Sequence, residues 1–167
     1  MPRQVHPPKP SEALTLGVRA FIGHFFNVSD RPECNEEWVD SFCDEATLVM
    51  GPDVANGRQE IRTLREGMWQ FVAARKHKVT KVFMGGVEQV EGRSDVAQKK
   101  EAEDVDDDDD GGQKAENECE LIMFGNVEYR LKTREEKSVE WAAQGRVRKV
   151  NGKFRWTYYR VYLGQDS

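Results

Sequence analysis

His77 is the side chain in this sequence best suited to moving a proton near neutral pH. It opens a segment, residues 77–90, whose alternation predicts a strand, and alternate residues of a strand share one face. If that face lines a pocket, His77 can act as a general acid or base. If the strand ends there among basic neighbours, His77 is solvated instead. The residues expected on the same face are Val79, Lys81 and Phe83.

Tyr129 and Tyr158 are candidates for stabilising negative charge on a substrate, because a phenol can donate a hydrogen bond to a carbonyl oxygen. The alternative is that both are core aromatics whose hydroxyl groups are satisfied at the edge. Asp30 ends the first expected helix and could approach the pocket mouth, although the same local sequence also makes an ordinary turn or cap. Arg160 is expected to share a strand face with Tyr158, where it could hold a substrate carboxylate or pair with an acidic helix residue.

Aromatic side chains supply the expected pocket walls, and the candidates for binding a substrate are Phe25, Trp69, Trp141 and Trp156. A catalytic carboxylate on an inner strand face is absent from the expected pattern, which argues against isomerase-type chemistry. A register error of one residue would swap the two faces, because side chains alternate with a period of two. The residues expected on the inner face of the strands after residue 117 are Cys119, Leu121, Met123, Val127, Tyr129, Val139, Trp141, Ala143 and Val147.

No metal or cofactor is expected. The three cysteines are too few and too scattered for a disulfide framework, and no Cys/His cluster has zinc spacing. The aspartate run at 104–110 lacks the ligand order of a calcium-binding EF-hand loop. The default interpretation is a solvated loop, and weak attraction to a basic protein is the alternative role.

The first 75 residues are mostly helical by pattern, because apolar residues recur there at three- and four-residue spacing. Ser11 is a plausible N-cap for the first helix, whose stripe includes Phe25. A second helix is expected over about 33–42 and a third over about 58–75. A short strand over 46–50 lies between them.

The last fifty residues predict consecutive strands, over about 118–132, 138–150 and 153–163. Asn151-Gly152 is a strong signal for a two-residue hairpin, and short turns imply antiparallel neighbours. One face of the last strand is expected to carry Phe154, Trp156, Tyr158 and Tyr162. The opposite, outer face of the sheet is expected to carry Ile122, Phe124, Ala142, Tyr159, Val161 and Leu163.

This order of elements predicts an α+β fold, in which a curved antiparallel sheet wraps over three N-terminal helices and leaves room for a pocket. We expect a single domain over 11–163, as the length of 167 residues suggests. A disordered proline-rich arm, 1–10, is expected before it. A disordered acidic loop is expected to interrupt the domain at about 91–117.

Three segments carry a resemblance to the NTF2-like superfamily and, within it, to SnoaL-like proteins: Trp38 to Leu48, Gly57 to Ile61 and Asn151 to Trp156. The likeness covers about 11–90 and 118–163. It implies a cone-shaped fold with a pocket at its wide end and frequent dimers through the outer face of the sheet. Likeness to scytalone dehydratase, a member, implies histidines on pocket strands and an aspartate at a helix end, the places of His77 and Asp30.

The net charge of −5 argues against free nucleic acid as a partner. No stretch approaches the ~20 apolar residues that span a bilayer, and the N-terminus lacks the apolar core of a secretory signal. We therefore expect a cytoplasmic protein, with access to the nucleus left open, that takes no membrane partner. Apolar residues among charges on the outer sheet face suit a homodimer, or a solvated face.

Two hypotheses of function follow, and a third ranks last. The first is a cofactor-independent dehydratase, cyclase or isomerase that acts on an apolar, carbonyl-bearing small molecule, with His77 moving the proton. The second is a non-catalytic ligand-binding or dimeric adaptor module. The third is a nuclear-transport role, which no sequence motif in this chain supports. The family spans several chemistries, so its fold does not select among them.

Overall fold

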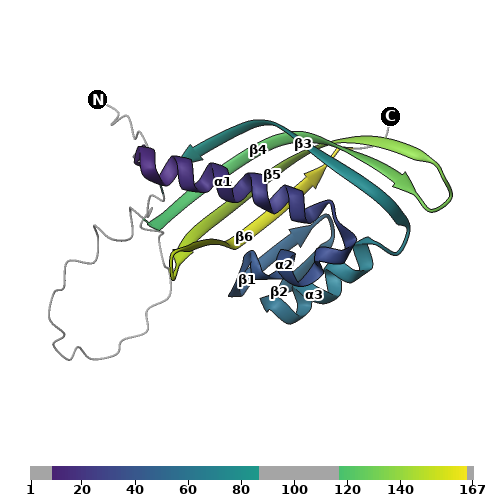
Figure 1. Ribbon diagram of the computed structural model, residues 1–167, viewed down its shortest axis with the longest axis horizontal. Helices are drawn as coiled ribbons and strands as arrows, with labels where there is room; N and C mark the ends of the chain where they lie inside the picture. The colour runs from purple at the N-terminus through teal and green to yellow at the C-terminus, as the bar shows by residue number, and fades with distance from the viewer. Residues whose placement is uncertain (1–8, 87–116, 165–167) are drawn as a thin grey trace, which may run out of the picture.

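The computed structural model describes residues 9–86 and 117–164, and there a curved sheet packs against three α-helices (Figure 1). The helices are α1 (Glu12–Ser29), α2 (Asn35–Asp40) and α3 (Gly57–Met68), with a 3₁₀ turn over Pro32–Cys34 before α2. The strands are β1 (Phe42–Met50), β2 (Asp53–Asn56), β3 (Val72–Gly85), β4 (Glu118–Leu131), β5 (Glu136–Val150) and β6 (Lys153–Leu163).

Helix α1 supplies the longest apolar stripe, and Figure 1 shows it lying across the sheet of β3 to β6. Ser11 caps it as predicted, because its side-chain oxygen accepts a hydrogen bond from the Leu14 N–H at 3.2 Å. The stripe is buried from Leu14 to Val28, and the helix ends at Ser29. The residue that follows, Asp30, is therefore held at the sheet by a well-packed helix.

The six strands lie in the order β2-β1-β6-β5-β4-β3. The predicted α+β layout of helices on a curved sheet is confirmed, and the four long strands after α3 are antiparallel neighbours as expected. The prediction of a wholly antiparallel sheet was wrong, because β1 pairs with β6 in parallel. Strand β2 was not predicted, and it pairs with β1 at one edge of the sheet.

The third helix is shorter than predicted, and this change moves a charged residue into the sheet. Helix α3 ends at Met68, and β3 already begins at Val72, where it pairs with Leu131 of β4. Strand pairing supplies the backbone hydrogen bonds that a longer helix would otherwise provide. Arg75, expected at the end of a helix, therefore lies on β3 two residues before His77 and on the same face.

A β-bulge in β6 reverses the predicted facing of that strand beyond Trp156. Trp156 lies opposite Val147 and Tyr158 lies opposite Arg146, so Thr157 is the extra residue. Because one added residue swaps the two faces, Tyr159 is buried whereas Arg160 is exposed. The prediction from strict alternation was wrong here, since it put Tyr158, Arg160 and Tyr162 inside and Tyr159, Val161 and Leu163 outside.

A second bulge, at Thr80 of β3, has the same effect. Val79 lies opposite Gly125 and Lys81 lies opposite Phe124, so Thr80 has no partner in the register. His77 and Val79 share the inner face as predicted, but Lys81 and Phe83 do not join them. Beyond the bulge the inner residues are Val82 and Met84, which pack against the core.

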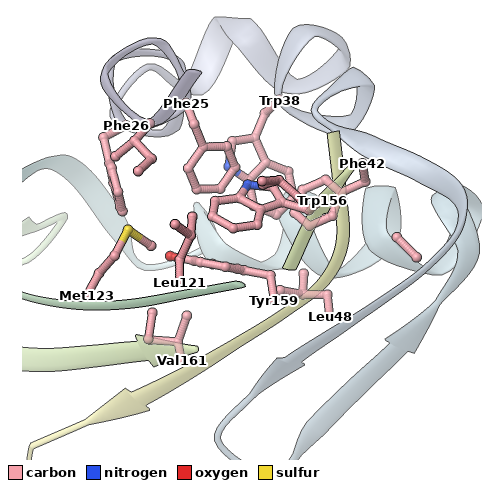
Figure 2. Packing of buried hydrophobic residues seen from close by; sticks show 14 of the residues in the cluster. Phe25, Phe26, Trp38, Phe42, Leu48, Leu121, Met123, Trp156, Tyr159 and Val161 are labelled. Carbon is pink, nitrogen blue, oxygen red and sulfur yellow. The ribbon is translucent and has the colours of Figure 1, made fainter. Parts of the chain in front are cut away.

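Two glycines let large indoles lie flat on the inner face of the sheet. A Cβ at Gly125 would come within 2.6 Å of the Trp141 ring, and one at Gly145 within 2.9 Å of Cε3 of Trp156. Figure 2 shows Trp156 packed with Phe25 and Trp38 above Tyr159, on the helix side of the sheet. The core therefore combines aromatic rings from α1 and α2 with rings from the sheet.

The predicted proline-rich arm and acidic loop lie almost entirely outside the described residues. In the part of the chain that the structure describes, no helix is both long and apolar enough to cross a membrane.

Candidate functional site

The carboxylate of Asp30 holds His77 by two of its atoms. Oδ2 accepts the backbone N–H of His77 at 2.9 Å, and Oδ1 lies 2.5 Å from the ring Nδ1. Because a carboxylate accepts hydrogen bonds, the imidazole donates from Nδ1, which leaves Nε2 as the free, basic nitrogen. The end of α1 thus fixes both the tautomer and the orientation of a histidine on β3.

The surroundings of His77 keep its imidazole neutral. The ring is packed near Phe26 and Trp141, with centroids 5.1 Å and 6.0 Å away. Burial lowers the pKa of His77 below its ordinary value; the hydrogen bond and charge of Asp30 oppose this change, while Arg75 and Arg65 reinforce it. A neutral imidazole backed by a carboxylate is the form that accepts a proton.

A cavity of about 270 Å³ lies between the end of α1 and the inner face of the sheet, and His77 is in its wall. Its lining is mainly apolar, with a few polar groups of types that can orient a ligand. The residues that line it are Phe25, Phe26, Ser29, Trp38, Met50, Gly51, Met68, Val72, Arg75, His77, Val127, Tyr129, Trp141, Tyr159, Val161 and Leu163.

Two tyrosines bring hydroxyl groups to this cavity. Tyr129 comes from β4, directly opposite Arg75 in the register, and Tyr159 comes from β6 just after its bulge. Burial raises the pKa of both phenols, although the positive charge of Arg75 opposes the rise. Both are therefore protonated and can donate a hydrogen bond to a ligand oxygen.

The structure brings together part of the predicted set of site residues. His77, Tyr129, Phe25 and Trp141 line the cavity, and Asp30 reaches it through its bonds to His77. Their catalytic and binding roles remain predictions.

The other predicted residues lie elsewhere. Trp156 is fully buried in the core, where its ring packs against Phe21 and Phe25. Trp69 stacks with Arg65 and Arg75 at 5.1 Å and 4.6 Å instead of lining the cavity. Beyond the Thr157 bulge, Tyr158 and Arg160 face away from the cavity, which corrects the predicted inward facing of both. Their side chains occupy the outer face of the sheet, where Arg160 stacks on Tyr162 at 4.8 Å.

Sequence reasoning missed Tyr159, Arg75 and the pairing of Asp30 with His77. Strict alternation excluded Tyr159, and no local signal in the sequence marks the bulge at Thr157. The third helix was predicted to continue to Arg75 from its apolar spacing, so the start of β3 at Val72 was missed. A carboxylate was sought on the strands, whereas the structure supplies one from the end of α1.

Among the residues in the described ranges, no group of three or more His, Cys, Asp and Glu side chains is arranged to hold a metal ion.

The fold is shared with solved structures at low sequence identity. A Nostoc punctiforme protein of unknown function with a cystatin-like fold aligns with a TM-score of 0.67 at 14% identity, over 95% of this chain and 97% of that one. A type 2 hexachlorocyclohexane dehydrochlorinase, LinA, aligns at 0.65 and 11% identity, over 93% and 90%. ActVI-ORFA from Streptomyces coelicolor aligns at 0.64 and 13% identity, over 90% and 97%.

No family model matches the chain, and no curated protein matches it either. The likeness in structure confirms the expected NTF2-like fold and, at these identities, carries no more than the fold.

Proposed function

We propose that this protein is an enzyme that transfers a proton within an apolar, carbonyl-bearing small molecule, without a cofactor. The observation that carries the proposal is the Asp30–His77 pair, with Nδ1 and Oδ1 2.5 Å apart, in the wall of a largely apolar cavity. Such a pair places a neutral, oriented base beside a mainly apolar space that suits a small molecule. The name of one similar structure, a dehydrochlorinase, denotes an elimination, which also begins with loss of a proton.

The mechanism follows from the positions of the donors and the base. Nε2 of His77 removes a proton from the carbon next to the substrate carbonyl, and Asp30 stabilises the imidazolium that forms. The electron pair moves onto the carbonyl oxygen, which accepts hydrogen bonds from Tyr129 or Tyr159. In a dehydration, the enolate then expels the hydroxyl group, which takes the proton from His77 and leaves as water. In an isomerisation, the same proton returns to another carbon.

Hydrogen–deuterium exchange tests the proposal even while the natural substrate is unidentified. A panel of apolar ketones is incubated with the protein in deuterated water, and exchange next to the carbonyl is followed by NMR. We expect at least one compound to exchange, and its rate to fall ~10²- to 10⁴-fold in His77→Gln. Asp30→Asn should lower the rate as well, because the ring loses its fixed tautomer.

His24→Gln is the matched control, since His24 is exposed on α1 and pairs with Glu37 at 3.2 Å, outside the cavity. It should exchange the same compound at the rate of the unmodified protein. Full exchange in His77→Gln, or no exchange of any ketone above the rate without protein, contradicts the proposed function.

The outer face of the sheet supports a second proposal, a homodimer. Four large apolar side chains are 41–58% exposed there: Phe83, Ile122, Phe124 and Tyr162. Phe83 and Phe124 touch edge to face across β3 and β4, with centroids 6.3 Å apart, so two of them form one patch. Exposed apolar patches on a sheet face are typical of contacts between copies.

Sedimentation analysis measures this association. Phe124→Glu puts a charge in the middle of the patch and should shift the protein to monomer. Phe71→Glu is the control, because Phe71 is 69% exposed and precedes β3, so it is not one of the strand residues that form the patch. A monomeric unmodified protein, or equal dissociation in both variants, contradicts the dimer. A dimer without exchange activity favours the adaptor alternative over the enzyme.

A further inference from the structure

The interior beside the cavity holds more positive than negative charge. Arg65 is fully buried and Arg75 lines the cavity, whereas the acidic group close enough to affect the pKa of both is Asp30. Asp30 is already bonded to His77. Neither arginine forms a salt bridge with a carboxylate in the described part of the chain. Burying a cation without a counterion is costly, so each arginine needs an explanation.

Arg65 is explained by structure alone. Its guanidinium bonds Asn35 Oδ1 and the carbonyl oxygens of Ser29 and Arg31 at 2.9 Å each. Its charge centre also lies 5.0 Å from the centre of the Trp38 ring. These contacts satisfy carbonyl groups at the C-terminus of α1, where a cation is favourable. Arg65 is not among the lining residues of the cavity.

Arg75 is only partly satisfied. Its Nε and Nη2 both donate to the carbonyl oxygen of Ser29, at 3.0 Å and 2.5 Å, and Nη2 also reaches the Ser29 hydroxyl at 3.2 Å. Among the described residues, the hydrogen-bond partner of its third nitrogen, Nη1, is the sulfur of Met68 at 3.6 Å, and the guanidinium also stacks on the Trp69 ring at 4.6 Å. A thioether is a weak acceptor, and Nη1 carries two protons. Met68 lines the same cavity, so this donor lies beside the space for a ligand.

Two neighbours extend this donor into a small recognition site. Tyr129 lies directly opposite Arg75 in the register of β3 and β4, and both line the cavity. No hydrogen-bond partner for the Tyr129 hydroxyl occurs among the described residues. His77 follows Arg75 on the same face, about 7 Å further along the strand by the rise of an extended chain. A charged end held at Arg75 would thus leave the rest of a short ligand beside the base.

From this geometry we infer that the cavity takes an apolar ligand carrying one carboxylate, which binds Nη1 of Arg75 and the hydroxyl of Tyr129. The carboxylate supplies the missing counterion, and the apolar part lies against Phe26 and Trp141. The inference names the substrate class of the proposed enzyme and rests on that proposal only in using the same cavity. It assigns to Arg75 the carboxylate-binding role that strand alternation alone gave to Arg160.

Binding of a matched pair of probes tests this inference. Naphthalene-2-carboxylate and the neutral naphthalene-2-carboxamide have the same two rings, and titration calorimetry gives their dissociation constants. The carboxylate should bind at least ~10-fold more tightly, because charge-assisted hydrogen bonds are the stronger kind. Arg75→Gln should remove this preference, and Arg75→Lys, which keeps the charge, should retain part of it. Arg160→Gln is the control and should retain all of it.

Equal affinity of the two probes for the unmodified protein overturns the inference, and this result needs no variant to fold. A preference that survives in Arg75→Gln overturns it too. His77→Gln separates the inference from the proposed function: it should lose proton exchange and keep the preference for the carboxylate. Loss of the preference in His77→Gln, with Arg75 intact, would place the anion at the histidine and contradict the site described here.

Discussion

At the scale of single residues, the Asp30–His77 pair shows how one carboxylate can serve structure and chemistry together. Its Oδ2 holds the backbone of β3 at 2.9 Å and its Oδ1 holds the ring. The ring is therefore placed by the same group that would stabilise its charged form. Burial pulls the pKa of His77 in one direction and Asp30 pulls it in the other, and burial is the larger effect.

Stability should depend on pH through His77. Its folded-state pKa lies below the ordinary value of 6.5, so the unfolded chain binds the proton more readily. The contribution of neutral His77 is therefore present above pH 6.5 and is lost as the pH falls below that value. Urea unfolding between pH 8 and pH 5 should show this decline, and it should be weaker in His77→Gln. An equal decline in both proteins contradicts the assignment.

The rate of proton exchange should depend on the protonation state of His77 as well. In the proposed mechanism the neutral imidazole is the base, so the acid limb of the rate profile should lie below pH 6.5, in line with the lowered pKa of His77. In Asp30→Asn the limb should move lower still, since the carboxylate raises this pKa. A limb above pH 6.5 in the unmodified protein would show that another group acts as the base.

At the scale of elements, the bulges decide which residues can reach the cavity. The hairpin at Asn151-Gly152 and the strands on either side of it were predictable from turn chemistry and alternation. The extra residues Thr80 and Thr157 were not, because a bulge depends on how the neighbouring strand pairs. Everything beyond them was assigned to the wrong face, and this is why Tyr158 replaced Tyr159 in the predicted site.

Adjacent tyrosines on the two sides of β6 give a sharp test of the bulge. Tyr159→Phe removes a hydroxyl in the cavity and should slow exchange by ~10-fold or more if that hydroxyl stabilises the enolate. Tyr158→Phe removes the same atom from the outer face and should leave the rate unchanged. The two rates should be compared on the same ketone, and a loss only in Tyr158→Phe would mean that the strand faces the other way.

The close contact between Gly125 and the Trp141 ring should make the stability of the protein sensitive to any side chain at position 125. In Gly125→Ala the new Cβ would press on the Trp141 ring and on the carbonyl oxygen of Lys78, neither of which can move freely. We expect a loss of about 1–3 kcal/mol in the free energy of unfolding. Gly23→Ala on α1 is the control, since nothing lies within 4 Å there and alanine favours a helix. Chemical denaturation measures both, and equal effects would contradict the close contact.

At the scale of the whole molecule, the sequence predicted most of the helices and strands but not the pairing of β1 with β6 that closes the cavity. Periodicity predicted α1 and the long strands, because each of those segments buries one face along its length. The parallel pairing of β1 with β6 brings together residues more than a hundred positions apart, for which no local signal exists. The cavity depends on that closure, since Met50 at the end of β1 and Gly51 just after it line the cavity together with Leu163.

Strand β3 forms one border of the sheet, and this has a consequence for solubility. The unpaired backbone N–H groups of an edge strand can form hydrogen bonds with a strand of another chain. Lysines at positions 76, 78 and 81 of β3 discourage such pairing, and Asp30 accepts a hydrogen bond from one of these N–H groups, that of His77. Removing the carboxylate of Asp30 would therefore do more than slow the proposed reaction. It would leave the backbone N–H of His77 unpaired on this edge strand and make the protein more prone to fibrous aggregation.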